Sequence, residues 1–258
     1  SLVTGTDLSS RPIVAGGNAA LKDALLPGLA AGRTQSAFAL TEPGAGSDVA
    51  RLATRFVDAP NGGVLISGEK KFITRAGTAD MLVVVARREG GPAGSKGLSA
   101  FVVPRPSPGL QVSATVPKAG WNGVPIAMVR FDQVHVPASQ RLGDEGRGMA
   151  IAQDTLLRAR IGHAAIALGR MRGALQIATQ YAAQRQVFGQ AVAGHQGIQW
   201  MVASMAATLE STRCLVYSTA LRYDAGDADA GVHASIAKMQ ATDACMRLVV
   251  DALQLLGG

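Results

Sequence analysis

The distribution of proline divides this chain into two parts that must fold differently. All eleven prolines precede Gly148, and none follows it. Proline removes a backbone donor and interrupts helices, so long helices are expected only after this point. Helix-forming residues dominate there in three blocks, roughly 148–184, 195–224 and 231–256. These lengths predict long antiparallel helices in a bundle.

The third of these blocks carries a stripe of large apolar residues. Asp243 interrupts the stripe, and we expect it to be an inward-facing polar contact. The stripe recurs at spacings of three and four, as one face of a helix does, and consists of Ile236, Met239, Met246, Val250 and Leu253.

Residues 36–145 show a different pattern, in which Gly and Pro separate short β-rich runs. Short strands at this spacing, without helices between them, favour an antiparallel sandwich or barrel. The predicted strands are 64–66, 81–86, 98–103, 110–116, 126–131 and 133–136.

The region before residue 36 carries one helix-like piece, 17–26, which we expect Pro27 and Gly28 to end. We therefore predict an α+β fold in which a β-sandwich or barrel domain precedes an antiparallel helical bundle. The predicted parts are the end of an N-terminal helical domain (1–35), a middle β-domain (36–147) and an incomplete helical bundle (148–258).

Composition narrows the class of protein. The 258 residues carry a net charge of +7, but aromatic residues make up only 4% and no Lys/Arg cluster occurs, which argues against nucleic-acid binding. A basic balance also suits small phosphorylated ligands. No run of 18 apolar residues and no signal peptide appears, so we expect no membrane span and a cytoplasmic location. Cys214 and Cys245 match no metal or redox spacing and are expected to be buried free thiols.

One short stretch, Ala39-Leu-Thr-Glu-Pro-Gly-Ala-Gly-Ser-Asp48, concentrates glycine and hydroxyl groups directly after an apolar strand. Glycines let a backbone approach a flat or phosphorylated ligand closely, because no Cβ intervenes. The hydroxyls of Thr41 and Ser47 can donate to ring nitrogens, carbonyls or phosphates. Taken alone, this stretch fits a surface turn equally well.

A second stretch, Gly68-Glu-Lys-Lys-Phe-Ile-Thr74, follows about two dozen residues later. Together the two resemble signature stretches of the flavin-binding middle domain of the acyl-CoA dehydrogenase family. Further matches follow in the family's order and extend the resemblance over essentially the whole chain: Phe131–Pro137, Arg185–Gly189, Gly194–Gln196 and Gln254–Gly258.

The resemblance implies an FAD site shared between subunits, and hence a homo-oligomer, expected to be a dimer of dimers. It also implies substrate contacts at Ser47 and Arg160. Without a ligand role, Arg160 would be a surface arginine, Arg185 a solvated charge at a helix end, and His195 a structural histidine. The FAD contacts implied are Phe38, Leu40, Thr41, Gly46 and Ser47 in the first stretch; Phe72, Ile73 and Thr74 in the second; Arg185, Gln186, Val187, His195 and Gln196; and Gln254, Gly257 and Gly258.

The activity implied is FAD-dependent dehydrogenation of an acyl-CoA to the trans-2-enoyl product, in fatty acid metabolism, with electrons passed to an electron-transfer flavoprotein. The alternatives are an acyl-CoA oxidase and a non-catalytic FAD-binding or structural subunit of a hetero-oligomer. The location implied is the bacterial cytoplasm, or the mitochondrial matrix in a eukaryote.

The catalytic base cannot be named from this sequence. Family members usually carry a glutamate shortly beyond the position of Gly258, and a subset places it where this chain has Ala159. The start at Ser1 and the end at a signature glycine pair favour a truncated chain over a natural variant without catalysis. The segment 118–126 lacks the arginine and serine common in the family. We expect Trp121 to fill that space by packing, and the alternative is that it shapes an unusual acyl pocket.

Overall fold

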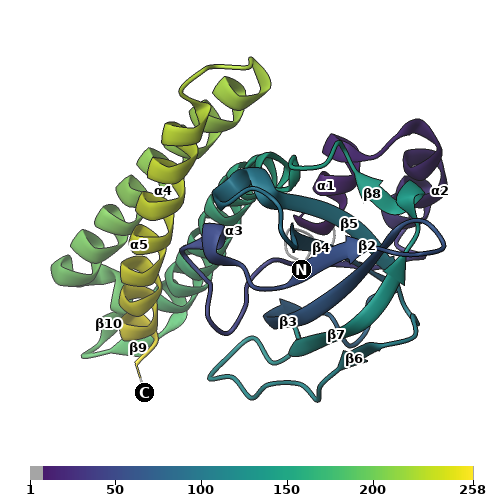
Figure 1. The fold of residues 1–258 in the computed structure, drawn as a ribbon. Helices are drawn as coiled ribbons and strands as arrows, with labels where there is room; N and C mark the ends of the chain where they lie inside the picture. Colours follow the sequence, from purple (N-terminus) through teal and green to yellow (C-terminus); the bar gives the residue numbers. More distant parts are fainter. Residues whose placement is uncertain (1–7, 258) are drawn as a thin grey trace. The chain divides into compact units, whose positions relative to one another are not determined.

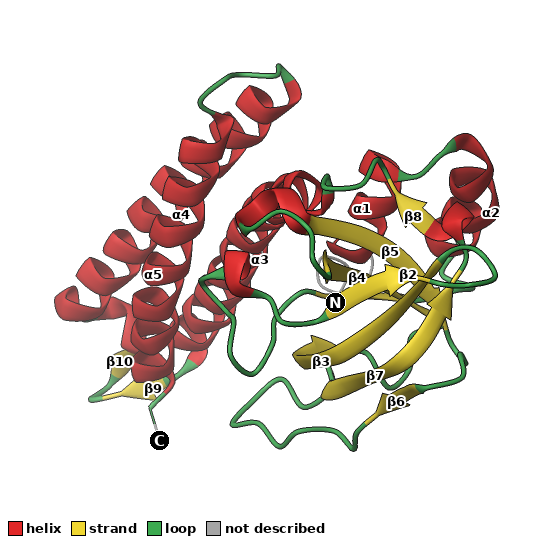
Figure 2. Cartoon of the chain, in the orientation of Figure 1, coloured by secondary structure: helices red, strands yellow, loops and turns green. Residues whose placement is uncertain are grey.

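The computed structural model describes residues 8–257, which form two compact units (Figures 1 and 2). The first unit ends at Leu156 and the second begins at Leu157. Strands make up most of the first unit and helices most of the second. The predicted α+β class, with a largely antiparallel sheet followed by a helical part, is confirmed.

Two helices precede the sheet, α1 (Leu8–Gly16) and α2 (Ala19–Ala30). Asn18 caps α2 by accepting a hydrogen bond from the Leu21 N–H at 2.9 Å. Helix α1 was not predicted, and the prediction that Pro27 ends α2 is wrong, because α2 continues past it to Ala30. Each helix contains one proline, and both helices contribute residues to the core of this unit, which favours the helical state despite the missing backbone donors.

A single eight-stranded sheet forms the centre of the first unit. Most neighbouring strands pair antiparallel, but β1 (Ser36–Ala39) and β2 (Arg55–Asp58) both pair parallel with β4 (Met81–Arg88). Strand β1 lies off the main path. The order along that path is β6 (Leu110–Val112), β7 (Ile126–Val136), β3 (Val64–Thr74), β2, β4, β5 (Leu98–Pro104) and β8 (Arg141–Leu142).

Several predicted strand boundaries differ from the observed ones. The expected strands at 126–131 and 133–136 are one strand, β7, which continues through Gln133 although that residue has a φ of 50°. Strand β6 is shorter than predicted. Strands β2 and β8 were missed because both are short, and β2 buries only one of its four side chains, that of Phe56.

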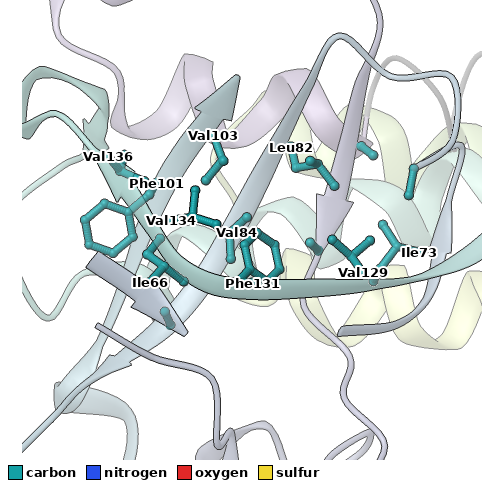
Figure 3. Packing of buried hydrophobic residues seen from close by; sticks show 14 of the residues in the cluster. Ile66, Ile73, Leu82, Val84, Phe101, Val103, Val129, Phe131, Val134 and Val136 are labelled. Carbon is teal, nitrogen blue, oxygen red and sulfur yellow. The ribbon is translucent and has the colours of Figure 1, made fainter. Parts of the chain in front are cut away.

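Strand β4 is buried on both faces, which explains its continuous apolar run. Leu82 and Val84 face one hydrophobic cluster, which also contains Phe101 (Figure 3). In this cluster Phe101 packs edge-on against Phe56, with ring centroids 5.0 Å apart. Val83 and its neighbours on the other face pack with apolar residues of α1 and α2 in a second cluster. A strand covered on both faces loses the alternation of polar and apolar residues.

The second unit contains the long helices α4 (Gln196–Asp224) and α5 (Ala230–Leu256) and most of α3 (Gly148–Gln184). The three predicted helical blocks are confirmed. A short hairpin, β9 (Gln186–Val187) with β10 (Gln190–Ala191), lies between α3 and α4. Short 3-10 turns occupy Val49–Arg51, Gly94–Gly97, Ala138–Gln140 and Val192–Gly194.

Helix α5 buries mainly small residues and leaves a stripe of large apolar residues exposed. Its buried face is lined largely by alanines, of which Ala234, Ala237 and Ala241 are fully buried, and it also includes Leu248 and Leu255. The expectation that Asp243 faces inward is wrong, because Asp243 is exposed. The apolar stripe that contains it, extended by Val232, is 40–68% exposed. Alanine lets helices approach closely, and the side chains of the stripe lie outside this contact.

Two further properties concern the described residues as a whole. Cys245 is buried and free as expected, but the expectation is wrong for Cys214, which is free and exposed on α4. Among residues 8–257, no helix combines the length and the apolar character that crossing a membrane requires.

Candidate functional site

The two signature stretches lie side by side in the first unit. The backbone N–H of Lys71 on β3 donates to the carbonyl of Thr41 at 2.8 Å. The ammonium of Lys70, also on β3, donates to the carbonyl of Leu40 at 3.0 Å. The glycine-rich loop after β1 is therefore attached through consecutive carbonyls to the strand that carries Phe72 and Thr74.

A buried ion pair strengthens this attachment. Lys70 Nζ lies 2.8 Å from Glu42 Oε1, and neither side chain is more than 4% exposed. Glu42 also accepts hydrogen bonds from the backbone N–H groups of Ala53, at 2.6 Å, and Thr54, at 3.0 Å. One carboxylate thus connects the loop, the segment before β2, and β3.

Burial affects the two charged groups of this pair differently. Removal from water lowers the pKa of Lys70 to about 8, although the charge of Glu42 opposes the shift. Burial alone would raise the pKa of Glu42, but the charge of Lys70 and the hydrogen bonds that the carboxylate accepts hold that pKa below its ordinary value. The carboxylate is therefore ionised at neutral pH.

The outer side of the loop is open. Glu42 and Ala45 exchange backbone hydrogen bonds across a tight turn, at 2.9 and 3.3 Å, which leaves Pro43 and Gly44 exposed at its tip. A Cβ added at Gly44 or Gly46 would meet no atom within 4 Å. This is the surface on which a flat or phosphorylated group could approach the backbone.

Hydroxyl groups provide the hydrogen-bonding capacity of this region. Those of Thr41 and Ser47 on the loop, and of Thr74 at the end of β3, have no partner among the described residues. A hydroxyl can both donate and accept, which suits flavin carbonyls, ring nitrogens and phosphate oxygens. The residues present in this unit therefore fit a flavin nucleotide.

Phe72 occupies a strained position beside the loop. The register between β3 and β7 shifts between Lys70 and Ile73, so that β3 bulges there. Phe72 adopts a φ of 59°, a conformation that is rare for bulky residues and concentrated at functional sites. Its ring is 50% exposed, with the Lys71 ammonium 4.7 Å from the ring centroid. The bulge thus presents an aromatic face at the surface.

Other predicted contacts offer only their backbone. The side chains of Leu40 and Ile73 are buried in the two hydrophobic clusters, and that of Phe38 packs against the second cluster. A ligand at this surface would meet the main chain of Leu40 and Ile73. Gly46 and Ser47, by contrast, are exposed.

The segment without the family's arginine and serine borders the end of β3. The Arg75 N–H donates to the Pro125 carbonyl at 2.8 Å, and the Lys118 ammonium donates to the carbonyls of Trp121 and Val124. Trp121 is 45% exposed, with a φ of 57°. About half of Trp121 is thus covered, and its role in this space stays a prediction.

In the second unit, the predicted cofactor contacts gather on the hairpin and at the start of α4. Arg185 and Gln186 are exposed, and Val187 is half-buried. The hairpin turn at Phe188 and Gly189, with φ of 50° and 78°, leaves the phenylalanine ring 97% exposed. Arg185, Gln186 and Phe188 are therefore exposed together on this short segment.

His195 lies next to this hairpin and has one unsatisfied nitrogen. Its Nδ1 lies 3.1 Å from the side-chain amide nitrogen of Gln190. Its Nε2 is buried and has no hydrogen-bond partner in the described chain. A buried polar nitrogen without a partner fits a contact supplied by a ligand or another subunit. Gln196 beside it is exposed.

Comparison with known proteins identifies the family. The acyl-CoA dehydrogenase middle domain matches residues 37–134, and the acyl-CoA dehydrogenase C-terminal domain matches residues 146–258. The chain belongs to the acyl-CoA dehydrogenase family. This bears out the resemblance found in the two signature stretches.

Individual relatives match over nearly the whole chain. This chain is 40% identical to an acyl-CoA dehydrogenase of Bacillus subtilis, and the match covers 98% of this chain and 66% of the relative. The caffeyl-CoA reductase-Etf complex subunit CarC of Acetobacterium woodii is 35% identical, over 100% of this chain and 67% of the relative. The solved butyryl-CoA dehydrogenase from Megasphaera elsdenii superposes with a TM-score of 0.94 at 36% identity, over 100% of this chain and 67% of that protein. The chain spans about two thirds of the length of these relatives.

The remaining predicted residues of this member of the acyl-CoA dehydrogenase family lie on α3 and at the end of α5. Ala159, at the position where a subset of the family carries the base, is buried, whereas Arg160 beside it is exposed. Gln254 is exposed, and Gly257 ends α5 with a φ of 79°. Gly258 lies outside the described residues.

Sequence reasoning did not assign a role to Glu42 or Lys70. Both lie within the signature stretches, where the interpretation concentrated on neighbouring residues that could contact a ligand. One signal was available in the sequence. Lys70 lies at an even spacing from the apolar residues Val64 and Ile66, and in a strand such positions face the same side.

Proposed function

We propose that this protein binds FAD and catalyses α,β-dehydrogenation of an acyl-CoA to the trans-2-enoyl product. The proposal depends on one observation above all. The glycine-rich loop and the end of β3 are hydrogen-bonded side by side, and together they offer open backbone and unpartnered hydroxyls. Membership of the acyl-CoA dehydrogenase family supports the reaction.

Each predicted residue has a role that follows from its chemistry. The loop with Thr41, Gly46 and Ser47 would hold the pyrophosphate and flavin through backbone and hydroxyl contacts. Phe72 would cover a face of the isoalloxazine ring. Thr74 would donate a hydrogen bond to that ring where negative charge develops. The chemistry that FAD supplies when bound is acceptance of the hydride that leaves the β-carbon.

The substrate and the base complete the reaction. Ser47 and Arg160 would contact the acyl-CoA, because a hydroxyl can bind a thioester carbonyl and a guanidinium can bind phosphates. Proton removal next to the carbonyl requires a carboxylate in a dry site. Ala159 has no such group, so we place the base on a glutamate that follows Gly258 in the complete protein.

We further propose that the protein is a homo-oligomer, a dimer of dimers, in which FAD is shared between subunits. The exposed hairpin supports this, since Arg185 could reach the pyrophosphate bound to a neighbouring copy. The orphaned Nε2 of His195 and the predicted contacts at Gln186, Val187, Gln196, Gln254 and Gly257 fit the same arrangement. The exposed apolar stripe of α5 supplies a further surface for assembly.

An electron-transfer flavoprotein is the proposed electron acceptor. A relative that belongs to an Etf complex supports this partner. Bacterial relatives support a cytoplasmic location. An acyl-CoA oxidase is separated from this proposal by the rate at which the reduced protein reacts with oxygen. A non-catalytic FAD-binding subunit is separated from it by the absence of any reaction with acyl-CoA.

Purification of the complete protein, followed by an acyl-CoA panel under anaerobic conditions, tests the proposal. We expect a yellow protein whose flavin absorbance is bleached by at least one acyl-CoA, with an enoyl-CoA as product. Protein that carries no flavin and cannot be reconstituted with FAD would contradict the cofactor assignment. Stable flavin binding without bleaching by any acyl-CoA would favour the non-catalytic subunit.

A further inference from the structure

We propose that the buried ion pair between Glu42 and Lys70 is a positioning device that holds the FAD-binding loop in its ligand-competent conformation before FAD arrives. This inference rests on the proposed function, since it names residues that shape the same site. Neither side chain lies on the open surface, so both act through the loop and are positioning residues.

The first argument is that Lys70 does not need a charge to fill its place in the core. It is completely buried on β3, opposite Val129 of β7. An apolar side chain of similar length would pack there, and replacing a buried ion pair by apolar residues often leaves stability unchanged or improves it. The charge of Lys70 is therefore explained better by its contacts with the loop than by a contribution to stability.

The second argument is the number of segments that meet at the pair. Lys70 Nζ donates to the Leu40 carbonyl at 3.0 Å and to Glu42 at 2.8 Å. Glu42 in turn accepts from the N–H groups of Ala53 and Thr54. Because Glu42 belongs to the loop itself, these contacts fix the loop from its inner side and leave its outer side unoccupied.

The third argument is that β3 is hydrogen-bonded to one wall of the proposed site, the loop, and carries the other wall, Phe72. The Lys71 N–H bonds to Thr41, and the next residue is Phe72, at the bulge with its φ of 59°. Only one residue separates the ion pair from the exposed ring along the chain. A shift of the pair would therefore move the loop and the aromatic wall relative to each other.

The consequence for ligand binding is preorganisation. A glycine-rich loop has many accessible conformations, and ordering it during binding weakens affinity. The ion pair and its hydrogen bonds order the loop in the absence of ligand. Loss of the pair is expected to weaken FAD binding even in a variant that folds normally.

The test uses three variants of the complete protein and one control. Lys70→Met removes one charge and leaves Glu42 buried without its partner. Glu42→Gln removes the other charge. The double variant Glu42→Gln/Lys70→Met removes both, so that no buried charge is left unpaired. Glu89→Gln is the matched control, since Glu89 forms an exposed ion pair with Arg55 at 3.3 Å in the same unit.

Three quantities are measured on each apo-protein: the midpoint of urea unfolding, the rate of backbone hydrogen exchange, and the Kd for FAD from flavin fluorescence. Hydrogen exchange is followed in peptides covering the loop, 40–47, and in peptides covering strand β5, 98–104, as the reference. We expect both single variants to exchange faster at 40–47 and to bind FAD at least about tenfold more weakly. In the double variant we expect the urea midpoint to recover, while the Kd stays raised and exchange at 40–47 stays fast. The control should match the wild type.

Two outcomes would overturn the inference. One is FAD affinity in the double variant that recovers together with the urea midpoint, which would make the role of the pair purely structural. The other is wild-type FAD affinity and loop protection in a folded single variant. If a single variant does not fold, the double variant decides between these outcomes. Failure of the wild type itself to bind FAD would instead contradict the proposed function.

Discussion

Phe72 offers a test that separates the strain of its backbone from the contact of its ring with the cofactor. The residue holds a φ of 59°, a left-handed conformation that glycine adopts freely and side chains resist. Replacing it by glycine removes a strain of order 1 kcal/mol. Because about half of the side chain is buried, the truncation also removes about 100 Å² of packing, which corresponds to about 2.5 kcal/mol at about 25 cal/mol per Å². Relief of strain offsets only part of this loss, so we expect Phe72→Gly to lower the free energy of unfolding by about 1–2 kcal/mol.

The effect on FAD affinity follows from the exposed half of the ring. A phenylalanine side chain presents about 200 Å², so a ligand that covers the exposed half buries about 100 Å² of it. At about 25 cal/mol per Å² this corresponds to about 2.5 kcal/mol. That is a roughly 60-fold change in Kd, since about 1.4 kcal/mol corresponds to tenfold.

The assay compares Phe72→Gly with Phe72→Ala in the complete protein. Both variants lose the ring, but alanine retains the resistance to a positive φ. We expect both to bind FAD roughly 60-fold more weakly, and we expect the urea midpoint of the glycine variant to exceed that of the alanine variant. Equal midpoints would refute the strain argument, and unchanged FAD affinity in both variants would refute the placement of the cofactor against this ring.

Three further predictions concern other parts of the molecule. Ala241→Leu inserts a larger side chain into the fully buried face of α5 and should lower the free energy of unfolding by about 1–3 kcal/mol in urea titration, whereas Gln240→Leu on the exposed side should have little effect. Met246→Glu, on the stripe that is 40–68% exposed, should dissociate the oligomer in analytical ultracentrifugation; an unchanged sedimentation coefficient, equal to that of Gln240→Glu, would contradict the assembly surface. Folding lowers the pKa of Glu42 from 4.5. Glu42 therefore contributes stability that is present above pH 4.5 and is lost as the pH falls through its folded-state pKa. Lys70 stays protonated throughout this range. The difference in urea midpoint between wild type and Glu42→Gln should therefore narrow from pH 7 to pH 3, and a constant difference would argue against ionisation of this carboxylate.

The long helices could be predicted because proline, glycine and helix-forming residues mark their ends with little ambiguity. The predicted blocks 195–224 and 231–256 differ from α4 and α5 by one residue at a boundary. Periodicity did not show which face of α5 is buried. A stripe of large apolar residues and a stripe of alanines have the same spacing, and only the approach of neighbouring helices decides between them.

The two signature stretches could be located from glycine and hydroxyl content, together with their order along the chain. Their side-by-side arrangement could not, because it depends on a lysine that crosses from one segment to the other. Short strands such as β2 also escaped prediction, since one buried phenylalanine in four residues carries no periodic signal. Long-range polar contacts leave little trace in local sequence.

The apolar stripe that α5 leaves exposed would link folding to abundance in the proposed oligomer. Apart from Leu248 and Leu255, the buried face of α5 consists mainly of small residues, so much of the apolar burial available to this helix is gained only when another surface covers the stripe. The thermal midpoint should accordingly rise with protein concentration, as mass action requires for a chain stabilised by self-association. At low expression levels, dilution alone would then expose these helices to proteases.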